Sequence, residues 1–165
     1  MKKLFLLAAC YCLYVSAFAQ SVPSKNYPGA NEFTGPVVQS AAYNRAQHHF
    51  SLAYPNVTDG YWRSSSDGGY ICQFEESEVT DQVRYNKRGR WVCTIAGYDA
   101  VKLPAAVREA VLNCYEGYRI TYVHEIDLNA PAPVYILNIE TLSKFRIIRV
   151  VGDDIEEIRH FDKID

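Results

Sequence analysis

The chain has 165 residues, of which 48% are hydrophobic, and its 17 basic and 19 acidic residues give a formal net charge of −2. This length is enough for one compact domain or for two small, closely packed units. A mildly acidic chain lacks the concentration of positive charge that nucleic-acid binding needs, so that class of function is disfavoured.

The first 19 residues have the pattern of a secretory signal peptide. Lys2 and Lys3 precede a short apolar run, and Ala17-Phe18-Ala19 forms a small-x-small cleavage site. The run is too short to span a membrane. We therefore predict a cleaved signal peptide over residues 1–19 and a periplasmic or secreted protein. Leu7-Ala8-Ala9-Cys10 resembles a lipobox, so a lipoprotein anchored through Cys10 is the minor alternative.

Removal of the signal leaves 15 basic and 19 acidic residues, a formal charge of −4, and no second apolar segment long enough to cross a bilayer. Residues 20–38 follow, with three prolines, two glycines and no apolar periodicity. Such a composition is typical of a loop or linker, and we predict a flexible N-terminal tether there.

The folded part begins with a predicted helix from about Ser40 to Tyr54, ended by Pro55. Four strand-like runs follow at about 60–65, 69–75, 79–85 and 90–96, separated by polar and glycine-rich turns. In the second run Tyr70, Cys72 and Phe74 share one parity, and in the fourth run Trp91, Cys93 and Ile95 do so. Each pattern predicts a strand with one face on a core.

A second unit repeats this order. Pro104 suits a first helical turn, and Val107, Ala110, Val111 and Cys114 form a stripe at helical spacing that predicts a buried helix face. Strands are predicted at about 118–126, 134–141, 144–151 and 154–161. Each unit is thus expected to be a helix followed by an antiparallel meander of four strands, an α+β arrangement.

Segments of the first unit also resemble segments of the second unit in sequence. Tyr70–Phe74 aligns with Tyr135–Ile139 at an offset of 65 residues, and Phe50–Tyr54 aligns with Val111–Tyr115 at an offset of 61. Two colinear matches of this kind indicate a duplicated unit with a small insertion in the second copy. We predict repeat 1 over residues 39–98 and repeat 2 over residues 99–165.

Three cysteines remain after signal cleavage, an odd number that cannot form a closed disulfide framework. We interpret them mainly as small core residues. Cys72 and Cys93 lie two strands apart in a simple meander, about 10 Å, which is too far for a disulfide. A bridge from Cys114 to either of them stays open.

Several residues in this order resemble a known family. Phe50-x3-Tyr54-Pro55, Trp62, Tyr70-x3-Phe74, Arg90-Trp91 and Leu103-Pro104-x2-Val107 are similar to the PepSY-like, beta-lactamase-inhibitor-like proteins of Bacteroidetes, over residues 41–162. The resemblance implies that the sheets of tandem helix-plus-four-strand units join into one curved sheet, with the helices on one face. It also implies an extracytoplasmic protein without established catalysis.

No pattern in the sequence indicates an enzyme. It has no Gly-x-Ser-x-Gly elbow, no glycine loop that would cradle phosphate, and no Cys or His beside a recognisable catalytic partner. His48 and His49 point about 100° apart on a helix and are poorly placed to chelate one ion. We predict no catalytic residues, no metal site and no cofactor. An acid/base role for Asp153 and Glu156 would need a pocket beside them.

A binding surface is the function that the pattern supports best. If Tyr70, Cys72 and Phe74 face the helices, their neighbours and the corresponding residues of the second unit form the opposite face. That face mixes Tyr, Arg, Ile and amide side chains, a composition found in interfaces, although β-forming residues beside long Arg stems also occur on plain sheet faces. The predicted binding residues are Tyr61, Arg63, Ile71, Gln73, Arg84, Tyr122, Ile136, Asn138 and Arg149.

We therefore predict a non-enzymatic binding module that docks a protein, a peptide or another envelope component on its open sheet face. The alternative is a structural envelope protein that self-associates through edge strands, for which the β-branched run Phe145–Val151 is the candidate. Neither prediction names the partner or the oligomeric state.

Overall fold

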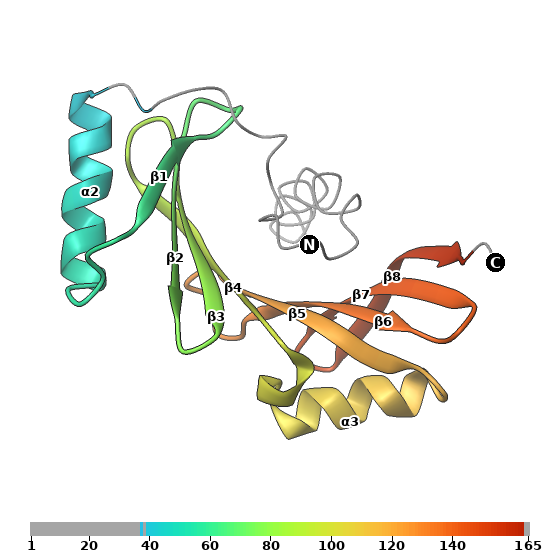
Figure 1. The fold of residues 1–165 in the computed structure, drawn as a ribbon. Coiled ribbons are helices and arrows are strands. Elements are labelled where there is room, and N and C mark those ends of the chain that lie inside the picture. Colours follow the sequence, from blue (N-terminus) through green and yellow to red (C-terminus); the bar gives the residue numbers. More distant parts are fainter. Residues whose placement is uncertain (1–36, 38, 164–165) are drawn as a thin grey trace.

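A computed structural model describes residue 37 and residues 39–163 of the chain (Figure 1). The predicted signal peptide, Cys10 as the minor alternative for lipidation, and nearly all of the predicted tether lie outside the described residues. Within them, the elements are one helix and four strands, then a short 3-10 turn, a second helix and four more strands. The α+β class predicted from the sequence is confirmed; the internal duplication stays a prediction.

The elements of the first half are α2 (Ala41–Ala53), β1 (Tyr61–Ser64), β2 (Tyr70–Glu76), β3 (Val79–Tyr85) and β4 (Trp91–Tyr98). The 3-10 turn η2 (Ala100–Lys102) leads to the second half. Its elements are α3 (Ala105–Cys114), β5 (Arg119–Asp127), β6 (Val134–Glu140), β7 (Lys144–Val151) and β8 (Asp154–Asp162).

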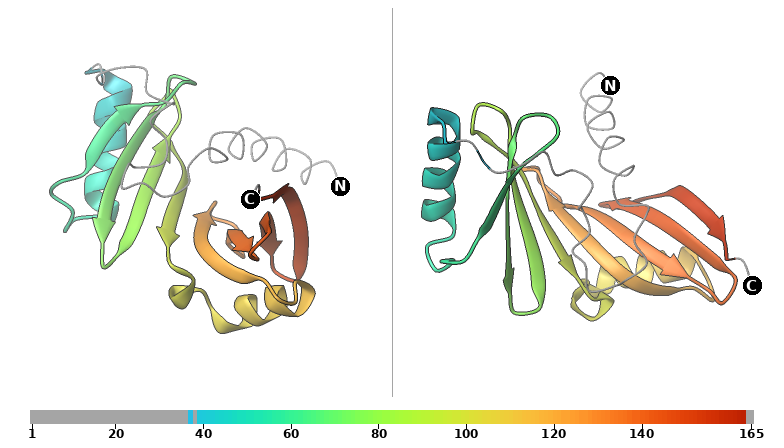
Figure 2. Two further views of the ribbon diagram at one scale, coloured as in Figure 1. Left: turned by 45° about the vertical axis from the view of Figure 1, so that its right-hand side comes forward. Right: turned by 45° about the horizontal axis from the view of Figure 1, so that its top comes forward.

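All eight strands form one antiparallel sheet in the order β1 to β8, so consecutive strands are always neighbours. The sheet bends between its halves, and both helices lie on the outer side of the bend (Figures 1 and 2). The edges are therefore β1 and β8. The Phe145–Val151 run, considered above as a possible edge, belongs to β7, which pairs with β6 on one side and β8 on the other.

Local sequence explains where α2 begins and what it buries. The Ser40 side chain accepts a hydrogen bond from the backbone N–H of Tyr43 at 3.0 Å, which satisfies a donor that the first helical turn leaves unpaired. Tyr43, Ala46 and Phe50 recur at helical spacing and are buried. Pro55 follows the helix and cannot continue it.

Two hydrophobic clusters fill the space between the helices and the sheet. The cluster below α2 consists of Ala46, Phe50, Cys72, Phe74, Val83 and Tyr85. The cluster at α3 includes Val111, Val123, Leu137, Ile139, Ile148 and Val150. We call the side of the sheet that carries Cys72, Val83 and Leu137 the convex face. The opposite side, which carries Ile71, Arg84 and Ile136, is the concave face.

Two expectations about the core are wrong. Trp91, Cys93 and Ile95 do not share a face, because the pairing of β3 with β4 shifts by one residue between Arg84 and Tyr85. Trp91 packs on the convex cluster, whereas Cys93 and Ile95 stand beside Arg84 and Gln82 on the concave face. Cys114, expected on the inward stripe of the second helix, is exposed at the end of α3.

The structure has Cys72, Cys93 and Cys114 as thiols. Cys72 lies on the convex face and Cys93 on the concave face, so the sheet itself separates them. Their separation was predicted from strand spacing alone, but the bulge in β4 is the stronger reason that they do not meet.

Candidate functional site: the concave face of the sheet

Strand pairing places all nine predicted binding residues on the concave face. In the first half, Arg63 pairs with Ile71, Ile71 with Arg84, and Tyr61 with Gln73. In the second half, Tyr122 pairs with Asn138 and Ile136 with Arg149. Directly paired residues in antiparallel strands point to the same side. The concave face therefore includes residues from both halves of the sheet. The role of the nine residues in binding stays a prediction.

The same pairings add residues that the sequence reasoning missed: Gln82, Cys93, Ile95, His124, Ile147 and Arg159. Gln82 could have been found, since it lies two positions before Arg84 on the same strand and must share its face. His124 stands in the same relation to Tyr122. Cys93 and Ile95 could not have been found in this way. Alternation from Trp91 would place them on the convex face, but the bulge in β4 moves them to the concave face.

The concave face is less open than its sequence suggests. Tyr61 has 60% of its surface exposed, but Arg63 keeps only 6%, Arg84 8% and Ile71 1%. Alternation along a strand sorts side chains by face, but it carries no information on how closely that face is covered. Arg84, expected to point freely into solvent, is instead a buried cation.

Arg84 acts electrostatically on two neighbours. Burial, together with the positive charge of Arg84, lowers the pKa of His124 to about 4, so this imidazole is neutral at pH 7. Burial raises the pKa of Asp67, but hydrogen bonds from Ser65 and the Gly69 N–H outweigh it, and Arg84 adds to their effect. Asp67 is therefore a stable carboxylate in the turn after β1.

A second arginine, Arg149, is held by acidic side chains of β8. Its Nη1 donates to Asp154 Oδ2 at 3.3 Å and to Glu156 Oε2 at 3.2 Å. Both carboxylates are well exposed, so these pairs contribute little to stability. They fix the direction of the guanidinium on the concave face.

Tyr122 packs close to Gly97 of the neighbouring strand β4. A Cβ added at Gly97 would come within 2.4 Å of the Tyr122 hydroxyl, so the absence of a side chain on β4 makes room for this ring. The Tyr122 ring also contacts His124 edge-on, with 4.9 Å between ring centroids. Tyr122 is thus a rigid aromatic residue near the bend of the sheet.

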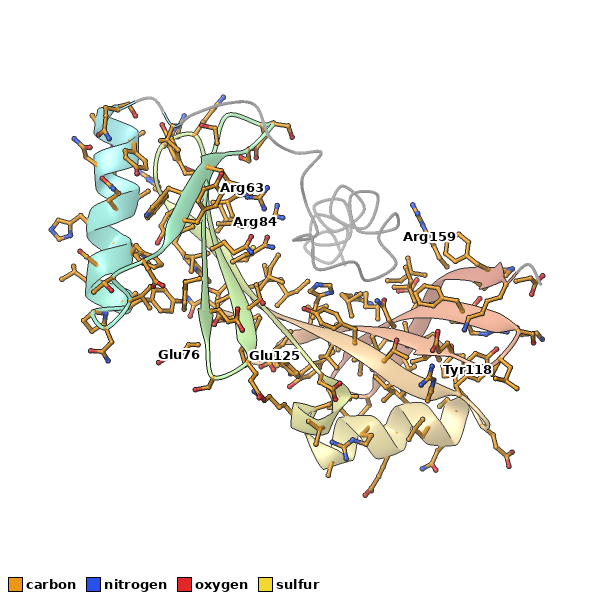
Figure 3. The ribbon with its side chains drawn as sticks, viewed as in Figure 1. Arg63, Glu76, Arg84, Tyr118, Glu125 and Arg159 are labelled. Atoms are coloured by element: carbon orange, nitrogen blue, oxygen red, sulfur yellow. The ribbon has the colours of Figure 1, made fainter. Side chains whose placement is uncertain are left out.

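On the convex face, acidic side chains lie on the strands between the two helices. Burial and the neighbouring Glu76 raise the pKa of Asp81 to about 6. The Tyr98 hydroxyl donates to Glu125 at 2.5 Å, and burial together with this carboxylate raises the Tyr98 pKa. The labelled side chains show the contrast: Arg63, Arg84 and Arg159 extend on the concave side, Glu76 and Glu125 on the other (Figure 3).

No metal site is assembled in this part of the chain. Over residues 39–163, no three His, Cys, Asp or Glu side chains are grouped so that they could hold an ion. His48 and His49 lie on α2, His124 on β5 and His160 on β8. His160 interacts with Glu157 at 2.9 Å.

Comparison with solved structures identifies the class of fold. A BLIP-like protein from Bacteroides fragilis matches with a TM-score of 0.62 at 18% identity, over 78% of this chain and 89% of the other. A DUF2874 family protein from Bacteroides ovatus gives 0.60 at 18% identity, over 72% and 85%. A candidate periplasmic protein from Bacteroides eggerthii gives 0.59 at 16% identity, over 72% and 87%.

The chain therefore has a BLIP-like α+β fold, as the resemblance to beta-lactamase-inhibitor-like proteins of Bacteroidetes implied. No family model matches the sequence, and neither does any curated protein. The PepSY-like part of the resemblance stays a prediction. At identities of 16–18% the likeness establishes the fold alone, and function has to be argued from the site.

Proposed function

We propose that this protein is a non-enzymatic, extracytoplasmic binding module that docks a protein, a peptide or another envelope component on its concave face. The observation that carries the proposal is that all nine predicted binding residues lie on one side of a single sheet, opposite the two helices α2 and α3. Tyr and Arg are the side chains most enriched where interfaces derive their energy. The face combines them with Ile and amide groups.

The location is supported from two sides. The sequence begins with the pattern of a secretory signal, and one of the similar solved structures is described as a candidate periplasmic protein. In residues 39–163 no helix is both long and apolar enough to cross a membrane. The name of the Bacteroides fragilis protein describes a likeness of fold, and inhibition of beta-lactamase is not part of the proposal.

The experiment uses an exposed residue on each face. Tyr61 is 60% exposed on the concave face, and Leu52 is 71% exposed on α2. Neither is buried, so aspartate at either position should leave the melting temperature nearly unchanged. The mature protein and both variants would be used to capture partners from the native envelope. Tyr61→Asp should reduce recovery of the partner at least tenfold, and Leu52→Asp should not.

Arg149→Gln is a milder test on the second half of the same face. It removes the cation while keeping a shorter polar side chain, and the ion pairs that are lost are with exposed carboxylates. We expect partner recovery to fall and the melting temperature to stay within a few degrees. Full recovery of the partner with both Tyr61→Asp and Arg149→Gln, combined with loss of the partner with Leu52→Asp, would show that the helices bind the partner instead.

Self-association through edge strands is the second candidate, and the structure gives it less support. The longer edge, β8, carries Asp154, Glu156, Glu157 and Arg159, and its pairing with β7 is shifted near Ile147. Charged side chains and bulges are features that discourage pairing with another chain. Sedimentation over a range of concentrations separates the candidates: a monomer at high concentration removes this one.

A further inference from the structure

The arginines on strands β5 to β8 differ in their ion pairs. Three of them bind carboxylates of neighbouring strands: Arg119 binds Glu140, Arg146 binds Glu157, and Arg149 binds Asp154 and Glu156. Arg159 on β8 is different, because among the described residues no acidic side chain forms an ion pair with it. Its side chain extends from the edge strand on the concave side (Figure 3). Arg159 can therefore accept a carboxylate from another molecule.

The side chains beside Arg159 on the concave face are apolar. Arg159 pairs with Ile147 of β7, and Phe161, two residues further along the same face of β8, pairs with Phe145. The two phenylalanine rings lie with their centroids 6.1 Å apart, and Phe161 keeps 44% of its surface exposed. We call Phe145, Ile147, Arg159 and Phe161 the β8 ledge. It places an accessible cation next to an accessible aromatic ring.

The acidic residues closest to Arg159 in the sequence do not neutralise it. Glu157 is bound by Arg146, and Asp162 directly follows Phe161, so it lies on the opposite face of the sheet. A guanidinium presents a planar set of N–H donors that fits a carboxylate, and an apolar surrounding strengthens such a pair. Charge and shape at the β8 ledge therefore complement an acidic side chain better than a basic or neutral one.

The spacing within the ledge indicates what else the partner carries. Arg159 and Phe161 are two positions apart on one strand, which separates them by about 6–7 Å. Residues i and i+2 of an extended partner segment have the same separation and also point to one side. Aromatic and Arg side chains are the ones most often found where interfaces derive their energy. An acidic and an apolar residue at this spacing would contact both at once.

We propose that the β8 ledge binds an extended protein segment in which an acidic and an apolar residue lie two positions apart. The carboxylate pairs with Arg159, and the apolar side chain packs on Phe161. The inference rests on the function proposed above and names the chemistry of its partner.

The experiment selects peptides from a random library on the immobilised mature protein. We expect the selected peptides to carry Asp or Glu two positions from Phe, Leu or Ile. Selection on Arg159→Gln should lose the acidic preference. Selection on Arg88→Gln, which removes an exposed arginine between β3 and β4, should keep it. A selection on the parent protein that enriches no acidic residue, or an acidic preference that persists with Arg159→Gln, would overturn the proposal.

A selected peptide and its analogue with an amide in place of the carboxylate give a quantitative decision by calorimetric titration. Removing the carboxylate should weaken binding to the parent protein roughly fivefold, as expected for one ion pair in a partly exposed site. The same change should alter binding to Arg159→Gln by less than about twofold, because the pair is already lost. Equal losses with both proteins would mean that the carboxylate binds elsewhere.

Phe161→Ala tests the apolar contact separately. It should weaken binding of the selected peptide but keep the preference for the carboxylate over the amide. Both substitutions lie on the exposed edge strand, so the melting temperature should change little and serves as the check on folding. Unchanged binding with Phe161→Ala would show that the apolar side chain does not pack there.

Failure of this inference is distinct from failure of the proposed function. Partner capture with Tyr61→Asp tests docking through β1, at the other edge of the sheet. Loss of capture with Tyr61→Asp, combined with no acidic preference in the selected peptides, would keep the concave face as the docking surface and reject the β8 ledge alone.

Discussion

The two halves of the molecule bury different side chains beneath similar arrangements of helix and strands. Below α2 the contacts are between rings: Phe50 packs against Tyr54, Trp62 and Phe74, with centroids 5.0–5.6 Å apart. At α3 the largest fully buried side chains are aliphatic, among them Leu137 and Ile139. The comparison shows that the pattern of elements, more than the identity of the core residues, is common to both halves.

The halves also differ in how their helices meet the neighbouring turns. In the first half, the turn between β3 and β4 packs so closely on α2 that a Cβ at Gly89 would stand 1.9 Å from the Ala42 carbonyl oxygen. In the second half, Gly117 after α3 has open space around it. Both glycines have positive φ, so only the first is constrained by packing as well as by backbone conformation.

The largest expected effect follows from this difference. Gly89→Ala should lower the free energy of unfolding by about 4 kcal/mol, because backbone strain adds to a clash with the helix. Gly117→Ala has the strain alone and should cost about 1 kcal/mol. Urea unfolding of both variants measures the gap. Equal losses would show that the first turn can move away from α2, and the contrast between the halves would disappear.

Substitutions at corresponding core positions should give the next largest effect. The predicted duplication aligns Leu137 with Cys72, and both residues are fully buried, on β6 and β2. Leu137→Ala should cost about 3 kcal/mol through lost burial and the cavity left behind. Cys72→Ala removes a single heavy atom and should cost about 1 kcal/mol. Chemical denaturation tests this; a larger loss at Cys72 would mean that the aromatic half governs stability.

The smallest effect concerns Asp81 of the first half. Its folded pKa, about 6, lies above the ordinary value of 3.8, so the folded state binds the proton more tightly. The contribution of Asp81 to stability should therefore be most favourable below about pH 4, fall between pH 4 and 6, and level off above. A shift of this size is worth roughly 3 kcal/mol for a buried group, and about 1 kcal/mol is expected for this partly exposed one.

Asp81→Asn isolates this contribution. The variant should be more stable than the parent protein above pH 6 and should show a flatter dependence between pH 4 and 6. Asp153→Asn, in the exposed turn before β8, is the matched control and should change neither value. If the difference in stability between the parent and Asp81→Asn does not change over that range, the carboxyl of Asp81 is better solvated than its position implies.

Much of the fold could be predicted from the sequence because its signals are local. Helical spacing in Tyr43, Ala46 and Phe50 located α2, and alternation in Tyr70, Cys72 and Phe74 assigned the faces of β2. Alternation of side chains along each strand then assigned the nine candidate binding residues to one side of the sheet. Their assignment needed no knowledge of distant contacts.

The remaining features depend on contacts that parity does not encode. The bulge that moves Cys93 to the concave face arises from pairing between β3 and β4. The exposure of Cys114 depends on where α3 ends relative to the sheet. The burial of Arg84 depends on what lies over the face. Each requires the assembled tertiary structure, which a single strand or helix pattern does not specify.

The central claim is that the concave face is the recognition surface, and footprinting with a captured partner tests it most directly. Hydroxyl-radical modification would be compared with and without partner at four exposed residues. Tyr61 and Phe161 lie on the concave face, and Leu52 and Val101 lie on helical segments away from it. We predict protection of the first pair and unchanged modification of the second. Protection of Leu52 and Val101 alone would contradict the account.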